Sequence, residues 1–463
     1  MRKLALALAA LLSAGWVGYG AHRLLLYDSR YDALVTLGDE LIAKEMPFQA
    51  TRTYSAAISL RPGSAIAYVK RAEALRKQAN FAPAIDDLER AATLTPDVHL
   101  VSMRLAELYD EAGRFDDAAH HYQNVLAVDP GAADIWYALG LVYFRGGREA
   151  ESIAALNRAA ELRAGFWEAY YLRGAVFRAL GGRDEAEADL KKALELAPDA
   201  APARLALMAL YIENRDPARA MPLVQQEVNA NPGAALPYLH LAEVHRLAGH
   251  APEAIEAVGL ALEQDPNLPA AYLELGELWL DEATGRGDAI ALEKAVTALD
   301  SVVKMEPGNG AACLALGRAH LAMGDEVRAF SELKRAGEAT PPQAEAHRLL
   351  GDLYRARANY AEAVTAYHIY LLLEGQSPPV LERLGDTYLD LEKPGLAAET
   401  YLELAELEPH RVGPLAKAAS AFLLHGNAES AATVCRRGLA ANPENATLLE
   451  LLARAERRRP FAG

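Results

Sequence analysis

Histidine and cysteine are the residues in this sequence whose spacing offers the most direct test for metal or thiol chemistry. His240, His245 and His250 recur every five residues. A spacing of five does not stack side chains on one face of a helix, so the pattern disfavours a metal site. Cys313 and Cys435 fall on packing positions of helices far apart in the chain, which predicts two buried free thiols and no disulfide.

The short motifs that accompany common enzyme chemistries are absent from the sequence. It has no phosphate-binding G-x-x-x-x-G-K-[ST], no zinc-binding H-E-x-x-H, no nucleophile elbow G-x-S-x-G and no C-x-x-C pair. We therefore predict that the protein is not an enzyme, that it has no catalytic residues, metal or cofactor, and that it takes no small-molecule substrate. Its function is expected to come from a surface.

Composition and charge narrow the class of partner. The chain has 463 residues, 52% of them hydrophobic and 24% charged, which is typical of a folded protein. It carries 63 acidic against 47 basic side chains, a formal net charge of −16. Such a surface repels a polyphosphate over most of its area, so nucleic acid is not expected as a partner.

The N-terminal segment, residues 1–26, predicts contact with a membrane. Arg2 and Lys3 precede an uncharged apolar run from Leu4 to Ala21, which spans about 27 Å as a helix and is close to the ~30 Å hydrocarbon thickness. We expect one uncleaved transmembrane helix that contacts the membrane through residues 4–26. The alternative is a cleavable signal peptide, whose best processing site, at Gly20, is weak.

Orientation and compartment follow from the same segment. Its free amino terminus and signal-like layout place the N-terminus on the inner side. Usage rich in Ala and Arg looks bacterial. We therefore expect a single-pass protein of the bacterial inner membrane with its remaining residues in the periplasm, or a protein secreted to the periplasm after signal cleavage.

A period of 34 residues runs through the rest of the chain. It brings back a small residue, with one exception at Met208, at Gly38, Ala72, Ala106, Gly140, Gly174, Met208, Ala242, Gly276, Gly317, Gly351, Gly385 and Ala419. Apolar residues at helical spacing, such as Leu34, Leu37 and Leu41, predict two helices in each period. Small residues let the two helices approach closely.

The segment "IWYALGLVYFRGGREAESIAALNRAAELRA" carries aromatic, Leu, Gly, Tyr and Ala residues at the offsets of the tetratricopeptide repeat family. The chain resembles this family over residues 31–445, as twelve repeats. The resemblance implies an all-α fold, a right-handed superhelical α-solenoid, with a C-terminal capping helix and tail at 446–463. Arg71 and Arg173 stand where the family often has Leu, and we expect both to extend to the surface.

Seven extra residues interrupt the period within 280–294, between the two helices of the eighth repeat. We expect them to lengthen each helix by about one turn, roughly 5 Å. Thr284, Gly285 and Gly287 are expected to form a tip that is disordered when free, with Asp288 as the next N-cap. The insertion is either neutral loop drift or a docking hairpin, whose contacts would be Asp281, Glu282, Arg286 and Asp288.

The resemblance also implies where a partner would bind. In the family, the first helices of successive repeats line a concave groove that receives a peptide or helix of a partner protein. The groove-facing apolar candidates in repeats four to six are Tyr137, Leu141, Phe144, Tyr171, Ala175, Leu205, Ala209 and Ile212. They are either an exposed interaction site or side chains covered by neighbouring repeats.

Other groove positions are charged. These are Lys70, Glu73, Arg76 and Lys77 in repeat two, and Arg348, Asp352 and Arg355 in repeat ten. Mixed signs are typical of a solvated face. Some relatives bind acidic C-termini through Lys and Asn at positions that correspond here to Val35, Asp39, Val69 and Glu73, so a clamp of that kind is disfavoured.

These observations favour a non-enzymatic, membrane-tethered scaffold for protein–protein interaction. We expect it to recruit or assemble components of a bacterial cell-envelope machine, such as polysaccharide export, a pilus or a secretion apparatus. The alternative is a permanent structural subunit of a larger membrane protein complex. In either case we expect the apolar groove, and not the hairpin of repeat eight, to make the principal contact.

Overall fold

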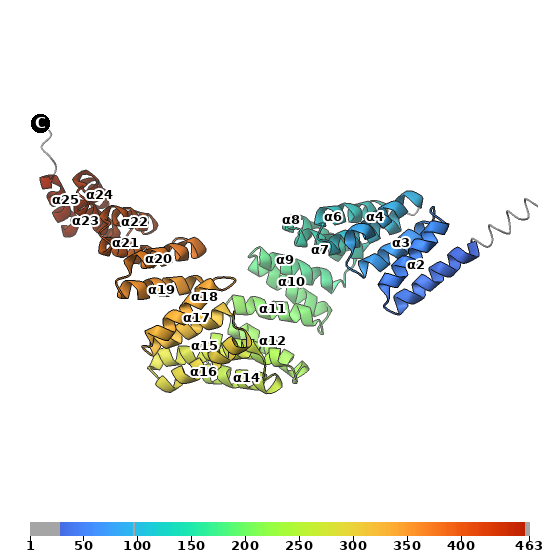
Figure 1. Cartoon of the computed structure of the whole chain (residues 1–463), viewed down its shortest axis with the longest axis horizontal. Coiled ribbons are helices and arrows are strands. Elements are labelled where there is room, and N and C mark those ends of the chain that lie inside the picture. The colour runs from blue at the N-terminus through green and yellow to red at the C-terminus, as the bar shows by residue number, and fades with distance from the viewer. Residues whose placement is uncertain (1–27, 96–97, 459–463) are drawn as a thin grey trace, which may run out of the picture. The chain divides into compact units, whose positions relative to one another are not determined.

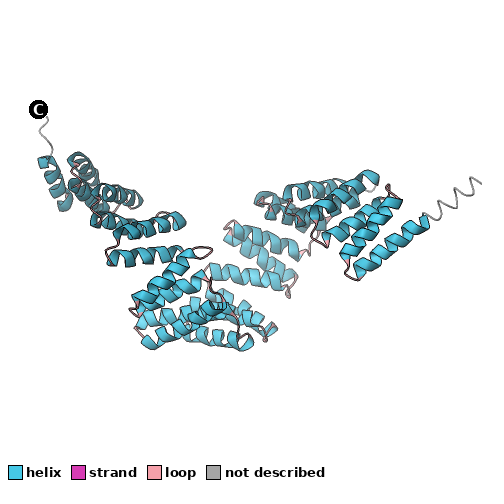
Figure 2. Cartoon of the chain, in the orientation of Figure 1, coloured by secondary structure: helices cyan, strands magenta, loops and turns pink. Residues whose placement is uncertain are grey.

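A computed structural model describes residues 28–95 and 98–458 of the chain. Within these ranges every regular element is a helix, and short turns connect the helices (Figure 2). The all-α expectation is confirmed. The chain divides into two compact units, Met1–Arg215 and Asp216–Gly463, and each is described by itself.

The first unit holds the repeats up to the first helix of repeat six (Figure 1). Residues 28–43 are helical and form the first helix of repeat one. The following helices are α2 Pro47–Leu60, α3 Ala65–Arg76, α4 Phe81–Leu94, α5 Val98–Glu111, α6 Phe115–Val128, α7 Ala133–Arg145, α8 Glu149–Leu162, α9 Trp167–Ala179, α10 Arg183–Leu196 and α11 Ala201–Glu213. Odd-numbered helices are the first helices of their repeats, and even-numbered helices are the second.

The second unit continues the same alternation. Its helices are α12 Pro217–Ala230, α13 Ala235–Leu247, α14 Ala251–Gln264, α15 Pro269–Arg286, α16 Ala289–Met305, α17 Gly310–Ala322, α18 Glu326–Glu338, α19 Ala344–Ala356, α20 Tyr360–Glu374, α21 Pro378–Asp390, α22 Pro394–Leu407, α23 Val412–Leu424, α24 Ala428–Ala441 and α25 Ala446–Arg458. The last helix buries Leu448, Leu451 and Ala455 and packs on α24 and α23.

The periodic small residue lies where the two helices of a repeat come closest. A Cβ added at Gly140 would lie 2.7 Å from Leu156, and one at Gly385 would lie 2.5 Å from the ring of Tyr401. Both distances are far below van der Waals contact. The large residue sixteen positions later therefore takes the space that a side chain at the glycine would need.

The N-terminal membrane segment predicted over residues 1–26 lies outside the described residues. Among the residues that the structure does describe, no helix combines the length and the apolar character needed to cross a membrane. The membrane expectations therefore stay predictions.

Candidate protein-binding surface

The eight groove residues predicted from the sequence lie on three consecutive first helices of the first unit, α7, α9 and α11. All eight are half-buried. We call this set the apolar stretch: Tyr137, Leu141, Phe144, Tyr171, Ala175, Leu205, Ala209 and Ile212. Consecutive first helices contact one another, so the stretch is continuous from α7 to α9 and from α9 to α11.

The structure brings three members of the stretch into one apolar cluster. Tyr137, Leu141 and Phe144 pack against buried Leu172 and Val176 of α9. These side chains therefore join α7 to α9 and still leave part of their surface to solvent. Each of the three side chains is therefore partly covered by the next repeat and partly exposed. Their role as an interaction site stays a prediction.

Aromatic side chains extend this cluster in both directions along the chain. The Tyr137 ring lies 5.3 Å from the ring of Phe166, and the Tyr171 ring lies 6.4 Å from that of Trp167. Burial raises the pKa of Tyr137, and the nearby Glu168 carboxylate adds to the rise. The phenol therefore stays neutral at physiological pH. It offers an apolar ring with a polar tip, a combination enriched at protein interfaces.

Charged side chains at the margin of the apolar stretch are already paired. Arg145 of α7 lies 2.6 Å from Asp110, and Arg178 of α9 lies 4.0 Å from Glu213. Both pairs join consecutive first helices near their C-terminal ends. Arg178 is the equivalent on α9 of Phe144 on α7 and Ile212 on α11, so the stretch is apolar on all three helices except at this paired cation.

In repeats two and three the same face carries charges that neutralise one another. Arg76 lies 2.7 Å from Glu73 and 2.7 Å from Glu111 of the next repeat. The hydrogen bond from Arg76 lowers the pKa of Glu73 in spite of partial burial. Burial also acts to raise the pKa of Asp39, but hydrogen bonds from Lys70 and Tyr54 outweigh it and the net change is downward.

These contacts bear on the carboxylate clamp that the sequence disfavoured. Of the four comparable positions, Val35 and Val69 are apolar, whereas Asp39 and Glu73 are acids held by cations of the chain itself. None of the four offers a donor to a partner's carboxylate. The expectation that this clamp is absent agrees with the contacts.

Three repeats share a triad that ties each one to the next. A buried tyrosine of a second helix donates its hydroxyl to an aspartate 15 residues earlier, and a cation 31 residues after that aspartate pairs with the same carboxylate. The triads are Asp39–Tyr54–Lys70, Asp352–Tyr367–Arg383 and Asp386–Tyr401–Lys417. Each aspartate follows a periodic glycine, whose missing side chain makes room for the tyrosine ring.

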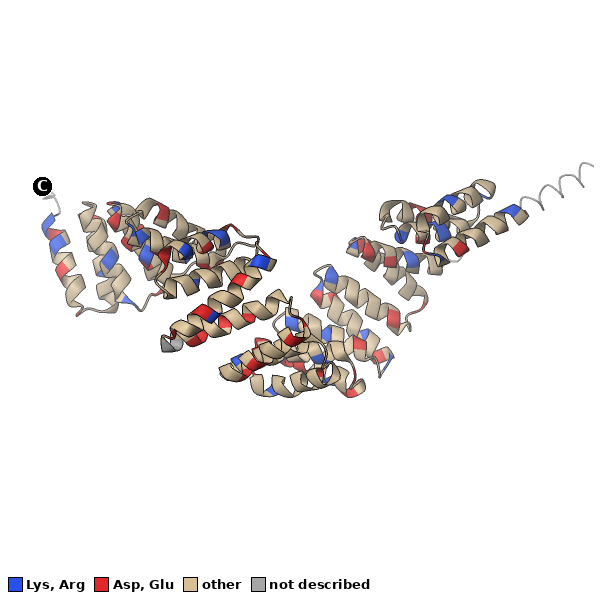
Figure 3. Cartoon of the chain, turned by 60° about the horizontal axis from the view of Figure 1, so that its bottom comes forward, with Lys and Arg blue, Asp and Glu red and all other residues tan. Residues whose placement is uncertain are grey.

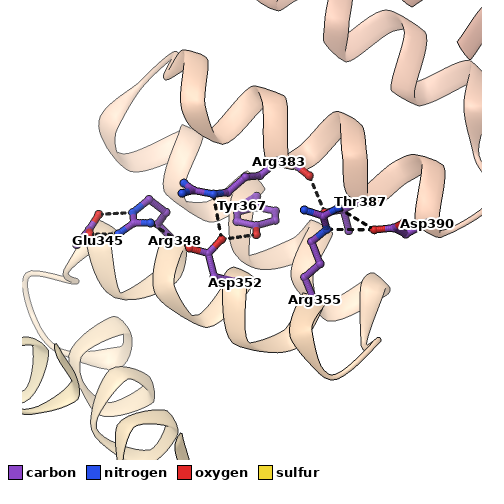
Figure 4. Close-up of polar contacts among 8 residues, drawn as sticks. All are labelled: Glu345, Arg348, Asp352, Arg355, Tyr367, Arg383, Thr387 and Asp390. Atoms are coloured by element: carbon purple, nitrogen blue, oxygen red, sulfur yellow. Dashed lines mark hydrogen bonds and ion pairs between the residues drawn. The ribbon is translucent and has the colours of Figure 1, made fainter. Parts of the chain in front are cut away.

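Figure 4 shows the triad of Asp352 together with its neighbours. Asp352 accepts the Tyr367 hydroxyl at 2.7 Å and lies 3.0 Å from Arg348 and 3.3 Å from Arg383. Arg355 turns to Asp390 of the next first helix at 3.0 Å. The charges predicted for repeat ten therefore bind one another. We call the charged first-helix residues of α19, α21 and α23 the ion-paired stretch.

No expectation from the sequence covered these triads, although a signal was present. Three of the five Gly-Asp pairs in the chain, at 38–39, 351–352 and 385–386, have Tyr 15 residues after the Asp and Lys or Arg 31 residues after it. Such a pattern becomes visible only when positions are compared across repeats. In Figure 3, basic and acidic positions are coloured on the ribbon, and both kinds occur on helices throughout the described part of the chain.

The expectation for Arg71 and Arg173 was wrong. Arg71 forms two hydrogen bonds to buried Asp87, of 2.7 and 2.6 Å, and Arg173 forms two of 2.6 Å to Asp189. Both guanidinium groups turn inward, because each finds a carboxylate on the second helix of its own repeat. Each also lies over the ring of a tyrosine three residues earlier, Tyr68 or Tyr170. A fork of donors facing a carboxylate is a stronger contact than solvation of a lone charge.

The insertion of repeat eight extends both helices, as expected. The first helix α15 has 18 residues and the second helix α16 has 17, whereas the corresponding helices of repeat seven, α13 and α14, have 13 and 14. The turn between them contains Gly287 with φ of 68°. Asp288 caps α16 by accepting from the backbone N–H groups of Ile290 and Ala291.

Helix continues to Arg286, so Thr284 and Gly285 lie in α15 and not in a loop at the tip. That the tip is disordered when free stays a prediction. The added turns build a small core in which Leu280 and Ala283 pack with Leu292 and Ala319. Of the docking candidates, Asp281 is exposed, Glu282 is half-buried, Asp288 is engaged as the cap, and the side chain of Arg286 lies outside the described part. Their role in docking stays a prediction.

The two cysteines are packing residues, and the spaced histidines of repeat seven do not form a metal site in the described residues. Cys313 and Cys435 are buried and free, as predicted. Burial raises the pKa of both thiols, which disfavours the reactive thiolate. His245 and His250 lie 6.1 Å apart between ring centroids. In the described residues no group of three metal-ligating side chains comes together.

Comparison with protein families decides the identity of the repeats. Models of the tetratricopeptide repeat match residues 35–99, 103–165, 168–200, 291–353 and 382–446, which together exceed half of the chain. The chain is a tetratricopeptide repeat protein. Proteins of this family generally mediate protein–protein interactions or act as scaffolds.

Solved structures similar to this tetratricopeptide repeat protein include one from Parabacteroides merdae ATCC 43184, which is 16% identical with a TM-score of 0.42 over 55% of this chain and 98% of that chain. The Cut9–Hcn1 hetero-tetramer of the APC/C is 15% identical, with a TM-score of 0.38 over 92% and 96%. Human IFIT1, solved with m7Gppp-AAAA, is 15% identical, with a TM-score of 0.43 over 82% and 90%. The family assignment rests on the repeat models.

Proposed function

We propose that this tetratricopeptide repeat protein is a non-enzymatic, membrane-tethered scaffold that recruits or assembles protein components of a bacterial cell-envelope machine. The apolar stretch of α7, α9 and α11 binds a peptide or helix of the partner. Residues 4–26 tether the chain to the inner membrane, and the repeats face the periplasm.

The observation that carries the proposal is the contrast in the first unit between paired charges and unpaired apolar surface. Three consecutive first helices present half-buried Tyr, Phe, Leu and Ile side chains, and the cations beside them are already engaged by acids. Aromatic side chains of this kind supply most binding energy when a partner covers them. The charged stretches have internal partners and offer less to a ligand.

The tether is supported by the sequence of residues 1–26 alone, namely two cations followed by an apolar run of membrane-spanning length. Its test is a fusion of alkaline phosphatase after Gly463, which we expect to be active in cells. An inactive phosphatase together with a fluorescent cytoplasmic reporter at the same site would reverse the orientation.

Binding is tested by affinity purification in mild detergent from cells that express the full chain or a triple variant in which Tyr137, Phe144 and Tyr171 are changed to Ser. We expect partner recovery to fall by orders of magnitude, because hot-spot residues contribute roughly 2 kcal/mol or more each. The matched control changes Arg348, Arg355 and Arg383 of the ion-paired stretch to Ser.

The triple variant removes side chains that also join α7 to α9, so folding must be followed separately. Circular dichroism and the urea midpoint of the variant are compared with those of the control. Loss of a partner at unchanged helicity supports the surface. If the groove variant keeps its partner and a shortened hairpin, without residues 281–287, loses it, the insertion of repeat eight is the binding site.

A further inference from the structure

The second helices share one solvent-facing position that the period brings back in each of the twelve repeats. Its occupants, all exposed, are Ser59, Thr93, Ala127, Glu161, Glu195, Asn229, Glu263, Lys304, Glu338, Leu372, Glu406 and Ala440. Eleven of the twelve are polar, charged or alanine. The exception, Leu372 in repeat ten, has 84% of its surface exposed.

Leu372 belongs to an apolar stripe on the outer face of α20. Leu373 beside it is 43% exposed, and Ile369, one turn earlier, is half-buried. The opposite face of α20 is buried through Ala363, Ala366 and Tyr367. A helix that is apolar on two faces normally has neighbours on both. In the described residues, α20 packs chiefly on its neighbours α19 and α21, and Leu372 and Leu373 remain exposed.

Acidic side chains occur at both ends of α20 and at the equivalent outward positions of the next second helix. Glu362 and Glu374 lie near the two ends of α20, and Glu399, Glu403 and Glu406 recur along the second helix of the next repeat, α22. The spacing of the last three, i, i+4 and i+7, places them on one helix face. They occupy the positions equivalent to Thr365, Ile369 and Leu372. All five carboxylates are exposed, and none pairs with a cation in the part of the chain that the structure describes.

We propose that the outer face of α20 and α22 is a second docking surface, which binds a basic amphipathic helix of a partner protein. The apolar face of that helix covers Ile369, Leu372 and Leu373, and its Lys or Arg residues lie against Glu399, Glu403 and Glu406. Complementary charge sets the orientation and the rate of association, while burial of the leucines supplies affinity. The surface is formed by second helices and does not depend on the apolar stretch.

The negative charge of this surface favours a basic helix over two other occupants, a second copy of the chain and an anionic membrane. A second copy that pairs the same patch with itself would place carboxylates against carboxylates, which costs several kcal/mol when like charges meet at an interface. An anionic membrane surface is repelled by the same acids. A basic protein segment is attracted by them and covers the leucines at the same time.

The test uses the full chain in detergent and two synthetic fluorescent peptides of about 18 residues, long enough to span α20 as a helix. Both carry Leu on one face, and the other face carries Lys in one peptide and Glu in the other. By fluorescence anisotropy we expect the Lys peptide to bind at least about tenfold more tightly, and Leu372→Ser to weaken that binding about tenfold. A matched change at the equivalent position of repeat twelve, Ala440→Ser, leaves it unchanged.

A charge-reversal variant separates the contribution of the carboxylates from that of the leucines. Glu403→Lys together with Glu406→Lys should weaken binding of the Lys peptide and strengthen binding of the Glu peptide. Added salt should then no longer weaken binding of the Lys peptide to this variant. Because Leu372, Glu403 and Glu406 are exposed, these variants are expected to keep wild-type helicity, checked by circular dichroism.

Three results overturn the proposal. The first is equal affinity of the chain for the two peptides, or equal affinity of wild type and Leu372→Ser for the Lys peptide. The second is a concentration-dependent dimer that Leu372→Ser abolishes, which makes a second copy the occupant. The third is sedimentation with phosphatidylglycerol vesicles that Leu372→Ser abolishes but removal of residues 1–26 does not, which makes the occupant a lipid surface.

Discussion

Equivalent positions on the first helices hold two different kinds of side chain in two parts of the chain. In the apolar stretch of α7, α9 and α11, half-buried aromatic and aliphatic side chains pack against the next repeat. In the ion-paired stretch of α19, α21 and α23, equivalent positions hold Arg348, Glu382, Asp352 and Asp386, which bind cations or acids and buried tyrosines. Both arrangements couple consecutive repeats.

The difference determines what a partner gains by binding. Covering the apolar stretch removes apolar surface from water. Covering the ion-paired stretch desolvates charges that are already neutralised, and the attraction gained offsets little of that cost. On the proposed function, side-chain chemistry on the first helices would therefore set the preferred binding region.

The largest effect is expected beside the apolar stretch, where Arg173 of α9 forms an inward ion pair with Asp189 of the same repeat. Asp189→Ala leaves the Arg173 guanidinium, 18% exposed, without its bidentate partner. We expect a loss of about 3 kcal/mol in unfolding free energy, measured by urea denaturation. The double variant Arg173→Leu/Asp189→Ala should recover most of it, because repeat four fills the same positions with Leu139 and Ala155. A double variant as unstable as the single one contradicts this account.

A smaller loss of stability, from removing one tyrosine hydroxyl, should distinguish the ion-paired stretch from the apolar stretch. Tyr401→Phe removes the hydroxyl that donates to Asp386 at 2.5 Å and should cost about 1.5 kcal/mol, because the acceptor is charged. Tyr171→Phe in the apolar stretch should cost less than about 0.5 kcal/mol, since its contacts are mainly apolar. The measurement is the urea midpoint of each variant. Equal losses would remove the distinction between the stretches.

Acid should weaken the ion-paired stretch selectively. A hydrogen bond from Lys417 lowers the pKa of Glu382 below its ordinary value of 4.5. The pair therefore contributes stability above about pH 4.5 and loses it as the pH falls through the lower folded pKa. We expect the urea midpoint to fall between pH 6 and pH 3, and to fall less in Glu382→Gln. Identical pH profiles for both proteins would show that this pair does not contribute.

Salt should have the smallest effect. Arg355 and Asp390 are 34% and 37% exposed, so their pair should contribute about 0.5 kcal/mol at low ionic strength and almost nothing near 1 M NaCl. Hydrogen exchange in α21 and in α9, measured at both salt concentrations, compares the two stretches. Faster exchange confined to α21 agrees with the expectation, and an equal change in α9 contradicts it.

The period made much of the fold predictable. Small residues such as Gly140 and Gly385 mark the close approach of two helices, because a Cβ there would overlap Leu156 or the ring of Tyr401. Asp288 was identified as a cap because a short acidic side chain after a glycine commonly starts a helix. These features are local, so spacing along the chain reveals them.

The inward turn of Arg71 and Arg173 was not predictable in the same way. An arginine at an apolar position extends to water or binds a buried acid, and the choice depends on whether Asp87 or Asp189 lies within reach across the repeat. The insertion tip is similar. Its helical state depends on the small core that Leu280 and Ala283 form with Ala319 of the next repeat.

The sequence by itself determined the helical class, the repeat length, the position of the insertion and the identity of the apolar stretch, because hydrophobic periodicity and glycine spacing act between near neighbours in the chain. The tertiary structure determined which charged side chains are paired within the protein. Asp39, Asp352 and Asp386 each meet a tyrosine of their own repeat and a cation of the next. Pairing energies depend on distances across repeats that no single window of sequence contains, so only the packed repeats show which surface remains free for a partner.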